Sequence, residues 1–501
     1  MNKDEQKKYS EMSFEDKQKF WEEVTGNDDL KLIGKVSNLD KENCEVKNLR
    51  NFKTREILNE REFKGINITS IEQGTINSKI IDDEVKEKGI KVGDEVSFKL
   101  YLSSKSKKGV YIKEKSIEPL NKTVKDIQSY LANDEEKPLN FNEETITHFY
   151  AGLRTDQLLV LAGPPGSGKT SLVEGFCKAT NSELRMIPVQ PNWIDRSDLL
   201  GFYNPLEKTY IPTPFLDALL EAGQSENKEQ LFIICLDEMN LAHVEYYFAE
   251  FLSKMQTDRT IQLYSETIKE EIEKELKELT GYFEVSDINS IELSDFYKIN
   301  PGVDINHFFQ MKKQQCFIEN YPPNLTVPNN VRFIGTINKD ATTKDLSPKV
   351  VDRSYLMKII PYEKDEYKYQ NHDNKEVLQL KIQDFAVNNE LVHKNINEFI
   401  DDLTIDMEKY NIRLTNRFRR TVKQLSGSEM FDDNDLKDVI LSSLVLPKIN
   451  KDKYEIEIDK LIKTLKDDIQ KHNLNISRRI LADMEVKDLD SNTINALTYW
   501  R

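Results

Sequence analysis

The chain has 501 residues, enough for several domains of ~100–200 residues each, and 32% of its residues are charged against 38% hydrophobic. This composition is that of a well-solvated globular protein and excludes the fibrous and low-complexity classes. No apolar run approaches the ~20 residues that cross a bilayer, and the charged N-terminus lacks the apolar segment of a secretion signal. Four cysteines without C-x-x-C spacing argue against a disulfide framework or a zinc ribbon and are typical of a reducing cytoplasm.

The formal net charge of −16 is unevenly distributed along the chain. Residues 1–30 are predicted to be a charged helical segment. Residues 31–120 are mildly basic, with 19 basic and 15 acidic side chains. An acidic bulk argues against a molecule that wraps DNA, but it leaves room for a local nucleic-acid or protein contact near the N-terminus.

Residues 31–120 are predicted to form a small β-rich domain. Apolar and polar residues alternate from Val96 to Leu100 and again from Val110, on either side of a polar stretch, which predicts a hairpin. The segment resembles an OB or cold-shock-type barrel, a fold that often binds single-stranded nucleic acid. Two interpretations stay open for the lysines and tyrosines of this hairpin. They contact nucleic acid, or the lysines are a solvated hairpin tip and the tyrosines belong to the core. These residues are Lys105, Lys107, Lys108, Tyr101 and Tyr111.

The strongest motif follows a linker at 121–140 and opens an α/β core predicted over 141–360. A short apolar strand from Leu158 leads into a glycine-rich loop and then a helix. Such a P-loop turns its backbone N–H groups toward phosphate oxygens, while Lys169 reaches the β- and γ-phosphates and Thr170 holds Mg²⁺. The predicted nucleotide-binding residues are Gly163, Pro164, Pro165, Gly166, Ser167, Gly168, Lys169, Thr170 and Ser171.

A second apolar strand, from Leu231, ends in Asp237 and Glu238. Beside a P-loop, Asp237 is predicted to bind Mg²⁺ and Glu238 to polarise the attacking water. The alternative is that this acidic pair only caps a helix. A run of six apolar residues before it is typical of a strand buried on both faces of a parallel sheet.

A third apolar strand, from Val331, ends in Asn338, which is predicted to orient the γ-phosphate or the water. Arg353 follows 15 residues later and is expected at the domain edge, where it would reach a neighbouring copy's nucleotide as an arginine finger. Its alternative is a surface ion pair with Asp352. The spacing from Asp237 to Asn338 exceeds what one helix and loop require, so an insertion with helical and loop character is predicted at about 259–325.

Together these residues resemble the AAA+ NTPases, and more narrowly the McrB-like branch, the motor subunits of modification-dependent restriction systems. The segments that carry the narrower resemblance are Trp193–Pro205 and Glu238–Phe248. The resemblance extends over 141–501, which includes a helical lid predicted at 361–501. In the lid, Arg413 and Arg417 are predicted to share one helical face. Arg417 resembles the family position that faces nucleotide, Arg413 is the alternate, and a basic solvated face is the third interpretation.

The resemblance implies a homo-oligomeric ring, usually a hexamer, with nucleotide bound between copies. It also implies a partner nuclease of the McrC type and an N-terminal domain that reads DNA or RNA. Well-known members, which prefer GTP, carry Met-Asn-Thr-x-Asp-Arg-Ser after the third strand. This chain has Ile337-Asn-Lys-Asp-Ala-Thr-Thr343 instead, so ATP is favoured and GTP stays open. The expected function is Mg²⁺-dependent hydrolysis that moves or remodels nucleic acid in bacterial defence. Its alternatives are a MoxR-type protein remodeller and a nucleotide-gated scaffold with little turnover.

Overall fold

The structure of the chain is a computed structural model. The described residues are 31–39, 44–51, 62–63, 66–67, 71–72, 75–78, 95–103, 111–119 and 122–499, the last range without 135, 284–287, 295–304, 339–343, 360–376, 386–393, 429, 453–457 and 488–493. The helices predicted for 1–30 and the lysines at 105, 107 and 108 lie outside these residues. The chain divides into two compact units, one comprising 1–128, 387–406 and 422–437 and the other comprising 129–386, 407–421 and 438–501.

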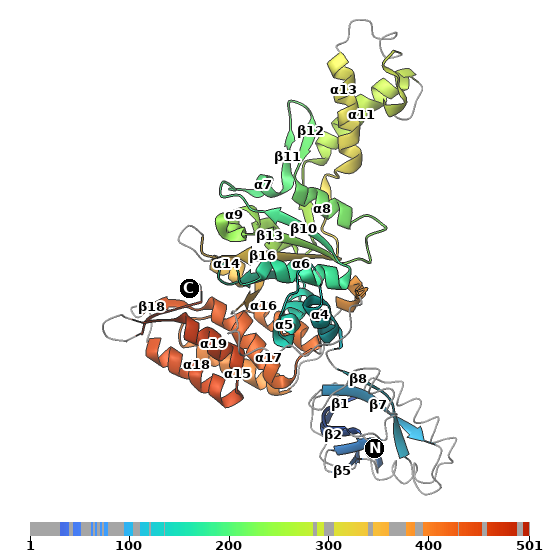
Figure 1. The fold of residues 1–501 in the computed structure, drawn as a ribbon. Coiled ribbons are helices and arrows are strands. Elements are labelled where there is room, and N and C mark those ends of the chain that lie inside the picture. The colour runs from blue at the N-terminus through green and yellow to red at the C-terminus, as the bar shows by residue number, and fades with distance from the viewer. Residues whose placement is uncertain are drawn as a thin grey trace, which may run out of the picture. The chain divides into compact units, whose positions relative to one another are not determined.

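The N-terminal part of the chain forms a six-stranded antiparallel sheet in the order β5-β6-β2-β1-β7-β8 (Figure 1). The predicted hairpin is confirmed, because β7 and β8 pair from Val96↔Pro119 to Ser103↔Tyr111. Closure of this sheet into a barrel stays a prediction. The strands are β1 (Lys31–Leu39), β2 (Cys44–Asn51), β5 (Ile71–Glu72), β6 (Thr75–Ser78), β7 (Glu95–Ser103) and β8 (Tyr111–Pro119), with a separate pair β3 (Glu62–Phe63) and β4 (Ile66–Asn67).

A five-stranded parallel sheet is the centre of the second unit, in the order β10-β13-β16-β9-β17. Every residue of β9 and of β16 is buried, as expected where helices cover both faces of a parallel sheet. The connections from β9 to β10 and from β10 to β13 run in opposite directions across the sheet. Because such connections are right-handed as a rule, α6 and α8 are expected on opposite faces. The elements are β9 (Leu158–Ala162), α6 (Lys169–Thr180), β10 (Glu183–Pro188), α8 (Pro214–Ala222), β13 (Phe232–Asp237), β16 (Val331–Ile337) and β17 (Ser354–Lys358).

Helices α4 (Lys122–Ala132) and α5 (Glu143–Arg154) precede the sheet. Asn142 caps α5 by accepting a hydrogen bond from the backbone N–H of Thr145 at 2.8 Å, which satisfies one of the free donors of the first turn. Phe149 of α5 then meets Phe176 of α6 edge to face, with ring centroids 5.0 Å apart. The helix before the P-loop strand is thereby held against the helix after it.

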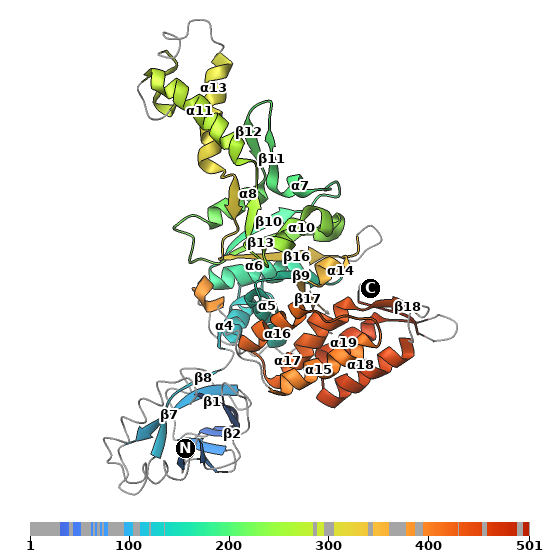
Figure 2. The same cartoon turned by 180° about the vertical axis from the view of Figure 1, so that it is seen from behind.

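The predicted insertion is a helical arm whose base is closed by two short paired strands, β14 (Thr260–Gln262) and β15 (Asn324–Thr326). Arg259 holds this base, since its guanidinium donates to Asp156 at 2.7 Å and to the carbonyl of Val327 at 3.1 Å. Figure 2 shows the arm, α11 (Glu266–Phe283) and α13 (Ile305–Asn320), extending beside a hairpin. The hairpin strands are β11 (Gly201–Asn204) and β12 (Thr209–Pro212), and between β13 and β14 lie α9 (Val244–Tyr247) and α10 (Ala249–Lys254).

The C-terminal part is mostly helical, as predicted for a lid, but it also contains a three-stranded antiparallel sheet that the sequence did not indicate. No helix of the described ranges is both long and apolar enough to span a bilayer. The elements are α14 (Pro348–Val351), α15 (Lys394–Glu408), α16 (Asn416–Gly427), α17 (Asp433–Val439), the π-helical η5 (Ile440–Val445), the 3₁₀ turn η6 (Leu446–Lys448), β18 (Asn450–Asp452), α18 (Ile458–His472), α19 (Asn475–Met484), β19 (Glu485–Lys487) and β20 (Ile494–Thr498).

Candidate active site

The P-loop lies where sequence analysis placed it, between the buried strand β9 and helix α6. Gly166 and Gly168 have φ values of 77° and 85°, the left-handed region that suits glycine, and Gly168 directly precedes the helix. The loop residues 164–166 are exposed, so the concave backbone is open to a ligand. A helix N-terminus with free backbone N–H groups behind such a loop favours bound phosphate.

Lys169 is the buried cation of this loop, with only 6% of its surface exposed. Its ammonium donates to the carbonyl oxygens of Gly163 and Pro164, both at 2.9 Å, and to Ser167 Oγ at 3.4 Å. Burial lowers the pKa of Lys169, and the negative charges of Asp237 and Glu238 oppose that shift. A desolvated ammonium held over a loop of backbone donors is suited to a polyphosphate.

Asp237 ends β13 and lies directly across from the start of α6. Its Oδ1 atom is 3.3 Å from Thr170 Oγ1 and accepts a 2.6 Å hydrogen bond from Thr336 Oγ1. Thr336 in turn accepts from the backbone N–H of Glu238 at 2.9 Å, so one buried hydroxyl orients both acidic residues. Sequence analysis missed Thr336, because its role depends on how β16 aligns with β13.

Glu238 and Asn338 meet at the same edge of the sheet. Glu238 adopts a left-handed backbone conformation, φ 51°, and its side chain is exposed. Asn338 Nδ2 donates to Glu238 Oε1 at 2.9 Å. The parallel pairing Ile337↔Ala162 sets Asn338 level with Gly163, the first residue of the P-loop. The structure therefore gathers five predicted residues, Lys169, Thr170, Asp237, Glu238 and Asn338.

The oxygens of Thr170 and Asp237 fit a magnesium ion that arrives with phosphate. Mg²⁺ usually takes one or two protein oxygens and completes its shell with phosphate and water. In the part of the chain that the structure describes, no group of three histidine, cysteine or acidic side chains could hold a metal by itself. The donor set thus fits the metal of a metal–nucleotide complex.

Arg353 lies at the other end of the sheet. It precedes β17, whose first residue, Ser354, pairs with Leu158, while Lys358 pairs with Ala162. Arg353 is therefore about six residues from Gly163 along the strand direction, or ~20 Å at the usual rise of ~3.3 Å per residue. An arginine side chain does not span that distance, so Arg353 does not reach the P-loop of its own chain.

Arg417 and Arg413 do not join the cluster at the P-loop. The guanidinium of Arg417 donates to Asp352 Oδ2 at 3.2 Å and to Gln256 Oε1 at 2.8 Å. The prediction that the two arginines share a helical face was wrong, because α16 begins only at Asn416 and Arg413 precedes it. The alternative ion pair of Arg353 with Asp352 is not formed either, since Asp352 pairs with Arg417 and Lys448.

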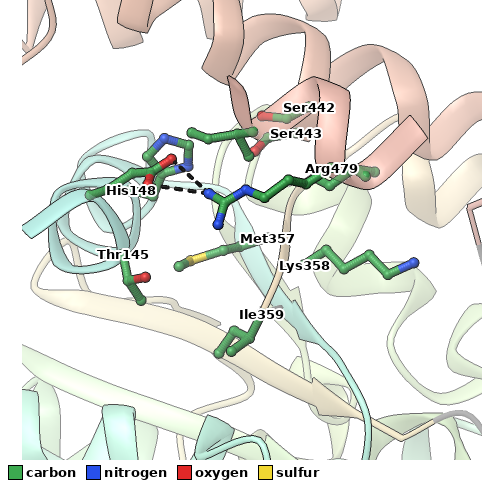
Figure 3. A pocket seen from close by; sticks show the side chains of 11 residues that line it. Thr145, His148, Met357, Lys358, Ile359, Ser442, Ser443 and Arg479 are labelled. Carbon is green, nitrogen blue, oxygen red and sulfur yellow. Dashed lines mark hydrogen bonds and ion pairs between the residues drawn. The ribbon is translucent and has the colours of Figure 1, made fainter. Parts of the chain in front are cut away.

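A pocket of about 420 Å³, including its open mouth, adjoins the P-loop through Ile359. The backbone N–H of Ile359 donates to Ala162 at 2.7 Å, and a Cβ on Gly163 would lie 2.8 Å from the carbonyl oxygen of Ile359. Figure 3 shows the Arg479 guanidinium extending toward His148. The lining residues are Glu144, Thr145, His148, Met357, Lys358, Ile359, Ser442, Ser443, Ile476, Arg479 and Ile480.

The polar groups of this pocket come from α5, β17, η5 and α19. Arg479 Nη2 is 3.3 Å from both carboxylate oxygens of Glu144. Burial lowers the pKa of His148 to about 4, and the positive charge of Arg479 adds to the shift. Sequence analysis missed Arg479, although Ser477-Arg-Arg479 at the start of a helix is a signal that could have drawn attention to it.

Comparison with known families agrees with this geometry. Residues 158–354 match a family model described as the AAA domain of the dynein-related subfamily. The match contains the P-loop, both acidic residues, Asn338 and Arg353. The chain thus carries an AAA+ domain, which is a nucleotide-binding domain. The predicted α/β fold with a central parallel sheet is confirmed. The McrB-like branch stays a prediction.

Individual relatives are distant. Midasin of Giardia intestinalis is 29% identical over 110 residues, which are 21% of this chain and only 2% of midasin. The crystal structure of a candidate ATPase from Cytophaga hutchinsonii aligns with 65% of this chain and 86% of that chain, at 13% identity and a TM-score of 0.37. At that TM-score the likeness says nothing about activity.

Proposed function

We propose that the protein is an oligomeric, Mg²⁺-dependent NTP hydrolase that uses ATP. The observation that carries this proposal is the meeting of Lys169, Thr170, Asp237, Glu238 and Asn338 at the carboxyl ends of three neighbouring parallel strands. Ligands of α/β sheets bind at that edge. The match to the AAA-domain family gives no support to GTP over ATP.

In the proposed reaction, water attacks the γ-phosphorus and the bond to the β-γ bridging oxygen breaks, giving ADP and inorganic phosphate. The Glu238 carboxylate accepts the proton of the attacking water, and Asn338 fixes that carboxylate and the water beside it. Lys169 neutralises charge on the β- and γ-phosphates. Thr170 and Asp237 would hold Mg²⁺, which supplies further charge neutralisation on the phosphates.

The nucleobase would lie in the pocket of Figure 3, because Ile359 lies against Gly163, the first P-loop glycine, and also lines that pocket. Arg479 is then the lid arginine closest to bound nucleotide. This assignment replaces Arg417, which is engaged at Asp352.

Arg353 would complete the site of a neighbouring copy. Because Arg353 lies ~20 Å from its own P-loop, the nucleotide that it can reach is one bound to a second copy of the chain. Such trans contacts require a homo-oligomer, and a hexameric ring is the form that the McrB-like resemblance implies.

The proposed work of the ring is to move or remodel nucleic acid for a partner nuclease of the McrC type in bacterial defence. The support is the resemblance of segments 193–205 and 238–248 to the McrB-like branch, together with the mildly basic region 31–120. Binding of the full chain to single-stranded DNA and RNA, with affinity falling steeply between 50 and about 200 mM salt, would support this client.

A specific feature favours the alternative of a protein client. The β11–β12 hairpin exposes Phe202 (50%), Leu206 (90%) and Ile211 (42%), and its one lysine, Lys208, pairs with Glu275 of the arm. Exposed apolar side chains without free cations suit polypeptide better than phosphate backbone. Stimulation of turnover by an unfolded protein, and not by nucleic acid, would establish this alternative.

Phosphate release from ATP with Mg²⁺ tests the hydrolase itself. The wild type should turn over, and Lys169→Ala should lose both nucleotide binding and turnover. A wild type that binds ATP but releases no phosphate above the Lys169→Ala background would instead identify a nucleotide-gated scaffold.

A further inference from the structure

Asp352, the residue before Arg353, is held by three side chains from C-terminal segments of the same compact unit. Its carboxylate accepts from Lys448 Nζ at 2.7 Å, Thr415 Oγ1 at 3.1 Å and Arg417 Nη1 at 3.2 Å. The side chains of Asp352 and Lys448 are only 18% and 13% exposed. A charge-assisted pair with so little water around it is weakly screened and holds its geometry well.

The backbone around Asp352 is fixed as well. The N–H groups of Asp352 and Arg353 donate to Pro348 and Val350 at 3.0 Å, which closes the last turn of α14. Val350 is fully buried. The turn that carries Arg353 is therefore anchored by the buried side chain of Val350 and by the hydrogen bonds of the Asp352 carboxylate.

Arg353 itself is left uncommitted by this arrangement. Its guanidinium forms no hydrogen bond or ion pair with any residue that the structure describes, although an aspartate is its direct neighbour in sequence. Both Asp352 oxygens already accept hydrogen bonds from other side chains, namely those of Lys448, Arg417 and Thr415. The same contacts that fix the turn also prevent Asp352 from capturing Arg353.

We propose that Asp352 is a positioning residue that presents Arg353 to the neighbouring copy. The inference rests on the proposed function, in which Arg353 completes a site in trans. Loss of the carboxylate frees the turn, and loss of Lys448 lets Asp352 pair with Arg353 within the chain. Either change weakens the finger without touching the P-loop of the chain that carries it.

Mixed oligomers can test this by separating the two roles of a chain. A Lys169→Ala chain supplies only the finger, and an Arg353→Ala chain supplies only the nucleotide pocket, so their mixture should recover part of the wild-type turnover. Adding Asp352→Ala to the finger-supplying chain should lower the recovered kcat roughly tenfold, since small misplacements of a charged group are costly. Adding it to the pocket-supplying chain should leave the recovered rate and its KM unchanged.

Milder variants keep the test valid if Asp352→Ala folds poorly. Lys448→Met in the finger-supplying chain should act like Asp352→Ala, and Lys448→Arg, which keeps the cation, should not. Equal losses of turnover with Asp352→Ala in the finger-supplying chain and in the pocket-supplying chain would show a general structural role. No loss with either would show that Asp352 is dispensable. Both results overturn the proposal. No recovery in the starting mixture would instead contradict the trans-acting Arg353 of the proposed function, and this inference would fall with it.

Discussion

Asn338 donates a 2.9 Å hydrogen bond to the carboxylate of Glu238, although the two residues are 100 positions apart in the sequence. The bond joins the ends of β16 and β13, which are neighbouring strands of the parallel sheet. Asn240 adds a second link, because its buried amide donates to the backbone carbonyl of Asn338 at 2.8 Å. The acidic residue that would activate water is thus fixed by the strand beside it.

This link gives a first prediction, for Glu238→Gln. Glutamine matches glutamate in size and still accepts from Asn338, so the site should keep its shape and bind nucleotide with unchanged affinity. It cannot accept the proton of water, and turnover should fall by roughly 10²–10⁴-fold. Phosphate release and binding of a fluorescent nucleotide measure the two properties separately. Turnover near that of the wild type would remove Glu238 from the role of base.

Asp237→Asn should change the magnesium requirement. The carboxylate lies 3.3 Å from Thr170 Oγ1, and a neutral amide is a poorer partner for a hard divalent cation. The Mg²⁺ concentration for half-maximal turnover should rise about tenfold or more. Thr336→Ser is the matched control, because it keeps the hydroxyl that orients Asp237. An Asp237→Asn enzyme with the wild-type magnesium curve would show that the metal is held elsewhere.

Local sequence patterns were sufficient to predict those parts of the site that are formed by a single continuous segment. The P-loop, the acidic strand end and Asn338 each follow an apolar strand, and parallel strands bring their carboxyl ends to one edge. Even the base of the insertion, β14 and β15, lies within a few residues of the predicted limits.

The parts that sequence reasoning missed depend on contacts between distant segments. Thr336 acts only because β16 pairs with β13 in one register, and Arg479 joins the pocket because α19 contacts α5. Arg417 was assigned from its resemblance alone, and its partner Asp352 is 65 residues away in the sequence. Helical spacing also misled, because Arg413 and Arg417 are four apart but the helix starts between them.

Gly335→Ala should destabilise the AAA+ domain. A Cβ at Gly335 would lie 1.9 Å from Met239 Sδ, so the fully buried Met239 side chain would have to shift within the core. Overpacking of this kind costs about 1–3 kcal/mol in the free energy of unfolding. Gly281→Ala is the matched control, because nothing lies within 4 Å of its Cβ and alanine favours a helix. Thermal unfolding should show a lower midpoint for Gly335→Ala and an unchanged midpoint for Gly281→Ala. Equal midpoints would mean that the Met239 side chain repacks without cost.

His148 gives a pH-dependent prediction. Burial lowers its pKa to about 4, against 6.5 for an exposed histidine, so between these values the unfolded chain binds a proton that the folded chain does not. Unfolding is therefore favoured as the pH falls, and the effect reaches about 3 kcal/mol near pH 4 at ~1.4 kcal/mol per pKa unit. His148→Gln removes this titration and should flatten the decline. The stability of the wild type relative to His148→Gln should rise from pH 4 to 6.5 and stay constant above it, measured by urea unfolding at a series of pH values. A difference that does not vary with pH would show that His148 is protonated to the same extent in both states.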